Sequence, residues 1–191
     1  MSNQQDITIL ILAGGAGQRV GGVDKGLLEY QGVRLINKQL EWAKGQAKTI
    51  LISANRNLPE YQRFGFPVLK DAGEAFSGPL NGVLKALQEC DTPWLFVQPI
   101  DLPNLPENTL DLMFSHKEKL ARCAYLESNS REHYLSMIIH QDCLKELEGY
   151  IKQGNSKVSL FHGFVNSQKI NLGLKEDKFL NLNRSDDYLL R

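Results

Sequence analysis

The chain has 191 residues, of which 42% are hydrophobic and 23% charged, a composition typical of a soluble globular protein with one domain. Its 22 basic residues balance 22 acidic ones, which argues against nucleic acid as the main partner. No apolar run approaches the roughly 20 residues of a membrane span. The polar residues 1–6 lack a signal-peptide core, so we expect a cytoplasmic protein with no membrane partner.

Neither linkers nor cysteines suggest a more elaborate organisation. No repeat or low-complexity tract interrupts the chain, so we expect residues 1–191 to form a single domain. Cys90, Cys123 and Cys143 are odd in number and far apart, which predicts buried thiols rather than disulfides. The four histidines lack the H-E-x-x-H spacing, which argues against a histidine-ligated metal.

Predicted strands and helices alternate along the chain, which is typical of an α/β domain with a mostly parallel sheet. Apolar runs predict strands at residues 7–12, 49–53, 67–69, 94–97, 121–126, 134–140 and 165–172. Helical spacing predicts helices at about 34–46, 59–63, from 77–79 onward, 107–116, 141–153 and 156–161. Residues 127–131 are predicted to be a polar turn and residues 185–190 a terminal turn.

A glycine-rich stretch follows the first predicted strand. Residues 12–25 read L-A-G-G-A-G-Q-R-V-G-G-V-D-K and hold five glycines together with Arg19 and Lys25. Glycines let the backbone approach a ligand closely, and clustered N–H groups form an anion nest. With two cations the stretch predicts a polyphosphate site, since a simple corner needs only one or two glycines. Asp24 either orients Lys25 or caps a turn.

Two better-known glycine loops do not fit this stretch. A P-loop needs Lys followed by Ser or Thr directly after the last glycine of G-x-x-x-x-G, and here Val23 follows Gly22. A dinucleotide-binding loop reads G-x-G-x-x-G, and Val20 occupies the position of its third glycine.

The pattern L-A-G-G-x-G-x-R-x-G-G-x-D-K resembles the signature loop of nucleotidyltransferases, most closely that of the molybdenum cofactor guanylyltransferase family. The resemblance extends from Leu12 to Asn183. It implies a single-domain, Rossmann-like nucleotidyltransferase fold with a mostly parallel sheet and helices on both faces. The nucleotide-binding positions that it implies in the loop are Leu12, Ala13, Gly14, Gly15 and Lys25.

Two aspartates follow predicted parallel strands, at whose carboxyl ends ligands bind in open sheets. Asp101 follows the most apolar strand, and a lone carboxylate there suits Mg²⁺, which takes one or two carboxylates plus substrate phosphates. The resembling family has a metal-binding aspartate in a P-x-D-x-P segment at this point. A turn aspartate between two prolines is the alternative, and the glycine loop favours the metal. Asp71 matches a nucleotide-contacting aspartate of the family, with a plain loop carboxylate as an even alternative.

The segments that resemble the family's acceptor side are less distinctive. Gly78, Pro79 and Gly82 match a G-P-L-x-G segment at a helix N-terminus, where anions are favoured. Asn181 and Asn183 resemble an N-x-N pair tied to pterin binding, and an asparagine helix cap is the alternative.

Two positions depart from the family's pattern. Residues 131–134 read R-E-H-Y, which matches an R-x-H-P segment except that Tyr134 replaces proline. At Ser53 the family often has asparagine.

The resemblance implies in-line transfer of GMP from GTP to the phosphate of molybdopterin, with pyrophosphate as the other product. Asp101 would hold Mg²⁺, while Arg19, Lys25 and the loop N–H groups would stabilise the leaving pyrophosphate. The expected partners are GTP and molybdopterin, with cofactor-handling or molybdoenzyme-maturation proteins as further candidates.

Three alternatives stay open: a nucleotidyltransferase that uses CTP, one that acts on a sugar phosphate, and a non-catalytic nucleotide-binding module. The Gly14 backbone can approach a purine edge closely, which favours guanine. Intact Lys25 and Asp101 favour an enzyme.

Overall fold

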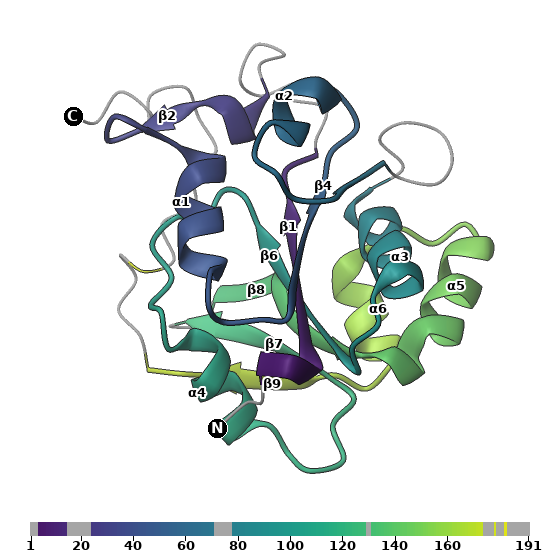
Figure 1. Ribbon diagram of the computed structural model, residues 1–191. Helices are drawn as coiled ribbons and strands as arrows, with labels where there is room; N and C mark the ends of the chain where they lie inside the picture. The colour runs from purple at the N-terminus through teal and green to yellow at the C-terminus, as the bar shows by residue number, and fades with distance from the viewer. Residues whose placement is uncertain are drawn as a thin grey trace.

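The computed structural model describes residues 4–14, 24–70, 78–128, 131–173, 178 and 182. Strands and helices alternate as predicted (Figure 1). The strands are β1 (Ile7–Leu12), β2 (Glu29–Tyr30), β3 (Val33–Arg34), β4 (Thr49–Ser53), β5 (Val68–Leu69), β6 (Trp94–Pro99), β7 (Cys123–Ser128), β8 (Arg131–His140) and β9 (Gln168–Asn171). The helices are α1 (Leu35–Ala43), α2 (Leu58–Gln62), α3 (Pro79–Glu89), α4 (Thr109–His116), α5 (Leu144–Lys152) and α6 (Val158–Phe164). Short 3₁₀ turns cover Gln4–Asp6, Lys25–Leu27 and Gln141–Cys143.

Seven of these strands form one sheet in the order β5-β4-β1-β6-β8-β7-β9, and β2 and β3 form a separate hairpin. Strand β8 runs antiparallel to both of its neighbours, and the other neighbouring pairs of the large sheet are parallel. The prediction of a mostly parallel α/β sheet is therefore confirmed. None of the described helices is long and apolar enough to cross a membrane.

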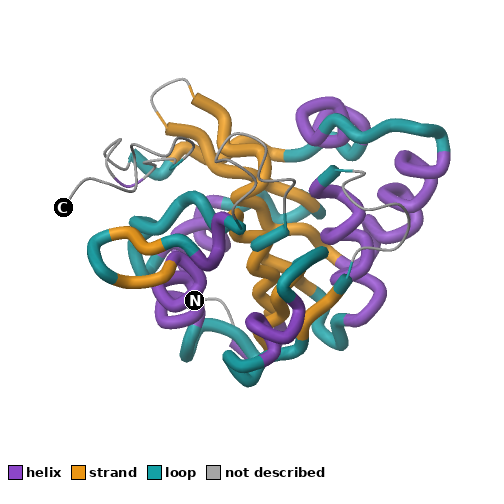
Figure 2. Tube along the Cα trace, turned by 90° about the horizontal axis from the view of Figure 1, so that it is seen from above, coloured by secondary structure: helices purple, strands orange, loops and turns teal. Residues whose placement is uncertain are grey.

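Helices cover both faces of the sheet, as predicted (Figures 1 and 2). Helices α1 and α4 pack on one face, and their apolar side chains share a core with Ile9 and Phe96. Helices α3, α5 and α6 pack on the other face, in a second core that includes Leu10 and Val97. Alternate residues of one strand thus serve different cores, which is why β1 and β6 are apolar almost throughout.

The polar turn predicted at residues 127–131 is wrong at residues 127, 128 and 131, which belong to strands, while residues 129–130 lie outside the described part of the chain. Glu127 pairs with Glu132, and Ser128 pairs with Arg131, in the ladder between β7 and β8. The two glutamates tolerate their opposition because Lys169 of β9 lies 3.2 Å from Glu127 and 2.9 Å from Glu132. A neighbouring strand thus supplies the countercharge that composition alone did not predict.

The predicted helix boundaries also differ from the observed ones by a few residues. The helix predicted at 34–46 ends at Ala43, because Gly45 takes a left-handed conformation with φ of 74° just beyond it. The helix predicted at 156–161 is α6, which begins and ends later. The terminal turn predicted at 185–190 lies outside the described residues.

Candidate functional site

The glycine-rich stretch begins at the carboxyl end of β1. The backbone N–H groups of Ala13 and Gly14 both donate to the carbonyl oxygen of Ser53, at 3.0 and 2.9 Å. A Cβ added to Gly14 would find only ordinary contacts of 3.6 Å with residues 53–55. The described neighbours therefore do not themselves require a glycine here, which fits a position kept small for a ligand.

The far end of the stretch is fixed by Asp24, which is 6% exposed. Its carboxylate accepts hydrogen bonds from the Tyr61 hydroxyl at 2.6 Å, from Asn57 Nδ2 at 3.1 Å and from the Gly26 N–H at 3.2 Å. Burial and the Asp24 carboxylate raise the pKa of Tyr61, so its hydroxyl stays a donor. A Cβ on Gly26 would collide with the Tyr61 hydroxyl, so this arrangement of Tyr61 requires glycine directly after Lys25.

Lys25 and Asp101, predicted separately from two motifs, come together. Lys25 Nζ lies 3.6 Å from Asp101 Oδ2, and both side chains are about one-fifth exposed. Burial raises the pKa of Asp101, and the nearby Lys25 ammonium opposes that rise. The carboxylate at the end of β6 thus meets the cation of the glycine-rich stretch, as the strand-end argument predicted.

Leu182, a residue that the motifs did not single out, joins this pair. Its N–H donates to the Asp101 carbonyl at 3.0 Å, and its carbonyl accepts from Lys25 Nζ at 3.3 Å. The Leu182 side chain is completely buried in the core beneath α1. Residue 182 therefore lies at the site, and the predicted N-x-N pair at Asn181 and Asn183, which flanks it, was the signal in the sequence.

The residues around Asp101 suit a hard divalent cation that takes one carboxylate ligand from the protein and its other ligands from a substrate and water. Within the described ranges, no group of three or more His, Cys, Asp or Glu side chains could hold a metal ion by itself. A single carboxylate fits Mg²⁺, which completes its coordination with phosphate oxygens and water.

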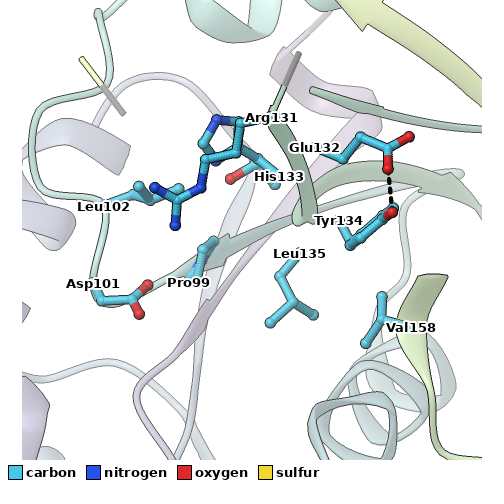
Figure 3. A pocket seen from close by; sticks show the side chains of 10 residues that line it. Pro99, Asp101, Leu102, Arg131, Glu132, His133, Tyr134, Leu135 and Val158 are labelled. Carbon is cyan, nitrogen blue, oxygen red and sulfur yellow. Dashed lines mark hydrogen bonds between the residues drawn. The ribbon is translucent and has the colours of Figure 1, made fainter. Parts of the chain in front are cut away.

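A cavity of about 240 Å³ opens on the other side of Asp101 (Figure 3). It is lined by Pro99, Asp101 and Leu102 at the end of β6, by residues 131–136 of β8 and by Val158 of α6. An irregularity in β8 shapes this cavity. Tyr125 pairs with Met137, but the next residue of β7, Leu126, pairs with His133, so residues 134–136 bulge out of the ladder. Such bulges re-aim side chains, and here they face the cavity.

Glu132 anchors a polar network at the rim of this cavity. It accepts hydrogen bonds from the hydroxyls of Tyr134 and Tyr125 and pairs with Lys169. These donors lower the pKa of Glu132 to about 2. Of the residues in this network, the sequence analysis singled out Tyr134, at a position where the resembling family has proline.

His133 also lines the cavity and is almost fully buried. Its Nε2 lies 2.7 Å from the Ser128 hydroxyl. Burial, assisted by the Arg131 charge, lowers the pKa of His133 to about 4. The imidazole is therefore neutral at neutral pH.

The remaining predicted residues divide into two groups. Gly78 precedes α3 with φ of 105°, which favours glycine, Pro79 is the first residue of α3, and Gly82 is buried within it. The structure therefore gives this segment a backbone role, and its acceptor role stays a prediction. The other predicted residues lie outside the described part of the chain: Gly15, Arg19, Asp71, Asn181 and Asn183.

Comparisons of sequence agree with the resemblance. The family model described as the MobA-like NTP transferase domain matches residues 9–165. A molybdenum cofactor guanylyltransferase of Serratia proteamaculans (strain 568) is 34% identical over 185 residues, which cover 97% of this chain and 93% of that protein. One from Yersinia pseudotuberculosis serotype O:1b (strain IP 31758) is 36% identical over 184 residues, which cover 96% and 94%.

Comparisons of structure agree on the fold. The molybdopterin-guanine dinucleotide biosynthesis protein A of Archaeoglobus fulgidus superposes with a TM-score of 0.78 at 21% identity, over 95% of each chain. A nucleotidyl transferase of Methanothermobacter thermautotroptrophicus superposes with a TM-score of 0.74 at 17% identity, over 96% of this chain and 94% of that one. The predicted nucleotidyltransferase fold is confirmed.

Proposed function

The chain belongs to the MobA-like NTP transferase family as a guanylyltransferase of molybdenum cofactor biosynthesis, and on that premise we propose how its residues perform the transfer. The donor is GTP, the acceptor is the phosphate of molybdopterin, and pyrophosphate leaves. The divalent metal of the reaction is Mg²⁺, the compartment is the cytoplasm, and proteins that handle the cofactor or mature molybdoenzymes are its protein partners.

The observation that carries this assignment is the meeting of Lys25 and Asp101, with 3.6 Å between Nζ and Oδ2. A cation on a glycine-rich loop and a carboxylate at a strand end are the two groups that a metal–triphosphate complex needs on the protein. Lys25 and Asp101 lie far apart in the sequence, so their proximity in the structure supports the motif independently.

Each residue then has a defined task. The Gly14 backbone borders the guanine edge, and Lys25 and Arg19 stabilise the charge that develops on the leaving pyrophosphate. Asp101 holds Mg²⁺, which when bound supplies Lewis-acid stabilisation of the phosphate oxygens. The acceptor phosphate is already ionised at neutral pH, so the transfer requires no general base.

Thermal unfolding with GTP, CTP, ATP or UTP, each with Mg²⁺, tests the base assignment. A nucleotide at about 100 times its dissociation constant adds about 2.7 kcal/mol, which raises Tm by roughly 5–10 °C in a chain of this size. We expect GTP alone to give the full shift. Equal protection by CTP would refute the guanylyl assignment.

Pyrophosphate release from GTP and molybdopterin tests the enzyme assignment. A non-catalytic binding module would show the thermal shift with GTP and release no pyrophosphate. Gly14→Ala is the matched variant for the base contact. Its added methyl group meets only ordinary contacts within the described protein, so a weaker GTP shift would report the ligand contact.

A further inference from the structure

Two buried glutamines converge on the turn that carries Asp101, and neither has a task in the transfer proposed above. Gln98 of β6 is completely buried, and its Nε2 donates to the carbonyl oxygen of Leu102 at 3.1 Å. Gln39 of α1 is 2% exposed, and its Nε2 donates to the same oxygen at 2.8 Å. Glutamine is rarely buried, because its amide loses hydrogen bonds to water. Two such side chains on one carbonyl oxygen therefore need a reason.

We propose that Gln39 and Gln98 are positioning residues for the metal ligand Asp101. By holding the carbonyl oxygen of Leu102 they fix the backbone one residue after the aspartate, and so they fix the direction in which its carboxylate points. This inference rests on the proposed function, in which Asp101 holds Mg²⁺, and it adds two residues that act on the metal through the backbone.

The backbone bonds of the turn around Asp101 are unequal. Before the aspartate, the N–H of Ile100 donates to the Leu12 carbonyl oxygen at 3.1 Å. After it, the N–H of Leu102 reaches the Pro99 carbonyl oxygen only at 3.4 Å, which is long for an N–H donor. The carbonyl oxygen of Leu102 has two lone pairs, and the two glutamine amides use both. The backbone of Leu102 therefore depends on the glutamines for its short hydrogen bonds.

Helix α1 connects this turn to the turn of Lys25. At the start of α1, the N–H of Leu35 donates to the Leu28 carbonyl oxygen at 2.9 Å, directly after the 3₁₀ turn that begins at Lys25. Four residues later, Gln39 reaches the turn of Asp101. Groups held by a helix are positioned more precisely than groups held by loops alone. The same helix thus helps to set the separation of 3.6 Å between Lys25 Nζ and Asp101 Oδ2.

The side-chain oxygen of Gln98 indicates that this residue serves function more than stability. Its Oε1 is buried and has no hydrogen-bond partner among the described residues. A buried amide oxygen without a partner destabilises a fold, whereas an apolar side chain of similar length does not carry this cost. Such local conflicts are expected at functional sites. The contribution of Gln98 is therefore the bond from its Nε2 to Leu102.

The two glutamines should act redundantly, because they donate to the same oxygen. When one is removed, the other still holds the carbonyl of Leu102. Groups that share a partner give non-additive effects, so single substitutions should have small effects and the double substitution a large one. Residues that orient a metal ligand from outside the coordination sphere typically contribute about 10–100-fold to metal affinity.

Calorimetric titration with GTP, in Mg²⁺ or in EDTA, tests the proposal on wild type, Gln39→Met, Gln98→Met and the double variant. Methionine keeps the length of glutamine and removes the donor. The ratio of the two GTP dissociation constants measures the coupling between metal and nucleotide. We expect this ratio to fall about threefold in each single variant and about thirtyfold in the double variant. The dissociation constant in EDTA should stay within about twofold of wild type, because the glycine-rich stretch is unchanged.

Turnover supplies a second measurement of the same effect. The Mg²⁺ concentration for half-maximal pyrophosphate release should rise by the same factors as the binding ratio falls. Saturating Mg²⁺ should restore kcat of the double variant to within about threefold of wild type, because Asp101 is still present. Asp101→Asn lacks the ligand itself, so saturating Mg²⁺ should not restore it.

Trp42→Phe is the matched control. Trp42 also lies on α1, and its Nε1 donates to the Pro106 carbonyl oxygen at 3.0 Å, four residues beyond Leu102. The variant removes the same kind of bond from the same helix, so Tm should fall by about 3 °C and the Mg²⁺ ratio should not change. Gln98→Met should keep or raise Tm, because it also removes the unpaired Oε1.

Two results overturn the proposal. The first is an unchanged Mg²⁺ ratio in the double variant, which would make both glutamines structural residues. The second is an equal fall of the ratio in Trp42→Phe, which would make α1 a general support of the site with no special task for the bonds to Leu102.

Failure of the proposed function gives a different result. If Mg²⁺ does not tighten GTP binding in wild type, the metal role of Asp101 is wrong, and a crystal structure of the double variant then decides the positioning. An Asp101 carboxylate that has moved away from Lys25, beyond the separation of 3.6 Å, would uphold the positioning role. An unmoved carboxylate and an unmoved turn would overturn it.

Discussion

The two halves of the sheet position their functional groups in different ways. In the half formed by β5, β4, β1 and β6, neighbouring strands are parallel, and the groups follow the strand ends, where backbone bonds fix them. In the half formed by β8, β7 and β9, an antiparallel hairpin with a bulge carries the groups within the strand itself, where Glu132, Lys169 and two tyrosines fix them. The first half positions its groups mainly through main-chain geometry, and the second mainly through contacts between side chains.

This difference predicts how each half responds to a substitution. A backbone nest depends on small residues at a few positions and remains the same for any ligand with a triphosphate. Contacts between side chains can change with each substitution. Tyr134, where the resembling family has proline, is such a change. We therefore expect substitutions in the parallel half to act through the backbone and those in the mixed half to act through the side-chain network around Glu132. The predictions below test the groups that make the two halves work together.

Asp101→Asn should have the largest effect, because Asp101 lies where the halves meet. The change keeps the shape and removes the charge that suits Mg²⁺, so turnover should fall about a thousandfold, equivalent to about 4 kcal/mol. Since burial already disfavours the charged form and raises the pKa of Asp101, Tm should fall little. A melting curve and a magnesium titration of activity check both points. Asp91→Asn, at an exposed aspartate, is the control, and a destabilised variant with an intact response to Mg²⁺ would contradict the metal role.

Lys25→Ala should reduce turnover about a hundredfold, the usual cost of losing one group that stabilises transition-state charge. Folding should change little, because a partly exposed ion pair contributes about 1 kcal/mol or less. Pyrophosphate release and thermal unfolding measure the two effects, with Lys48→Ala as the control at an exposed ion pair. Unchanged turnover would make Lys25 a structural cation that only holds Asp101 and Leu182.

Tyr61→Phe should affect the nucleotide half through Asp24. The variant keeps the ring and removes the donor to a buried carboxylate, which should cost about 2 kcal/mol of unfolding free energy. Tyr150→Phe is the matched control, because that hydroxyl donates to the neutral carbonyl of Lys157 and its loss should cost about 1 kcal/mol. Urea unfolding measures both variants. Equal losses of unfolding free energy in the two variants would mean that the bond from Tyr61 to the Asp24 carboxylate stabilises the fold no more than a bond to a neutral carbonyl.

The same division separates what the sequence predicted from what it did not. The strands and the approach of Lys25 to Asp101 were predictable, because apolar runs and glycine spacing are local patterns and parallel strand ends meet at one edge. The bond between Asp24 and Tyr61, 37 positions apart, was not predictable, since no local pattern records a long-range partner. The paired ends of β7 and β8 were predicted as a turn, because the countercharge of Lys169 comes from another strand. The bulge at 134–136 depends on register, which is a property of two strands together.

The smallest expected effect is a loss of folding stability in mild acid, and we expect it to arise in the half formed by β8, β7 and β9. His133 has a pKa of about 4 in the folded protein and about 6.5 when unfolded, so the unfolded state binds more protons as pH falls below about 6.5. This site should therefore remove about 1 kcal/mol of stability between about pH 7 and about pH 5.5. His162, whose pKa burial also lowers, adds a loss of the same sign, so His133→Gln should reduce the slope without abolishing it.

Urea unfolding at several pH values checks this slope, with His116→Gln, at an exposed histidine of α4, as the control. Both buried histidines belong to the half formed by β8, β7 and β9, since His133 lines the cavity and His162 Nε2 lies 2.8 Å from the Tyr134 carbonyl oxygen. GTP titrations at the same pH values, in wild type and His133→Gln, measure whether the loss of stability reaches the other half. A pH dependence of GTP binding that His133→Gln changes would mean that the two halves of the sheet are coupled in stability.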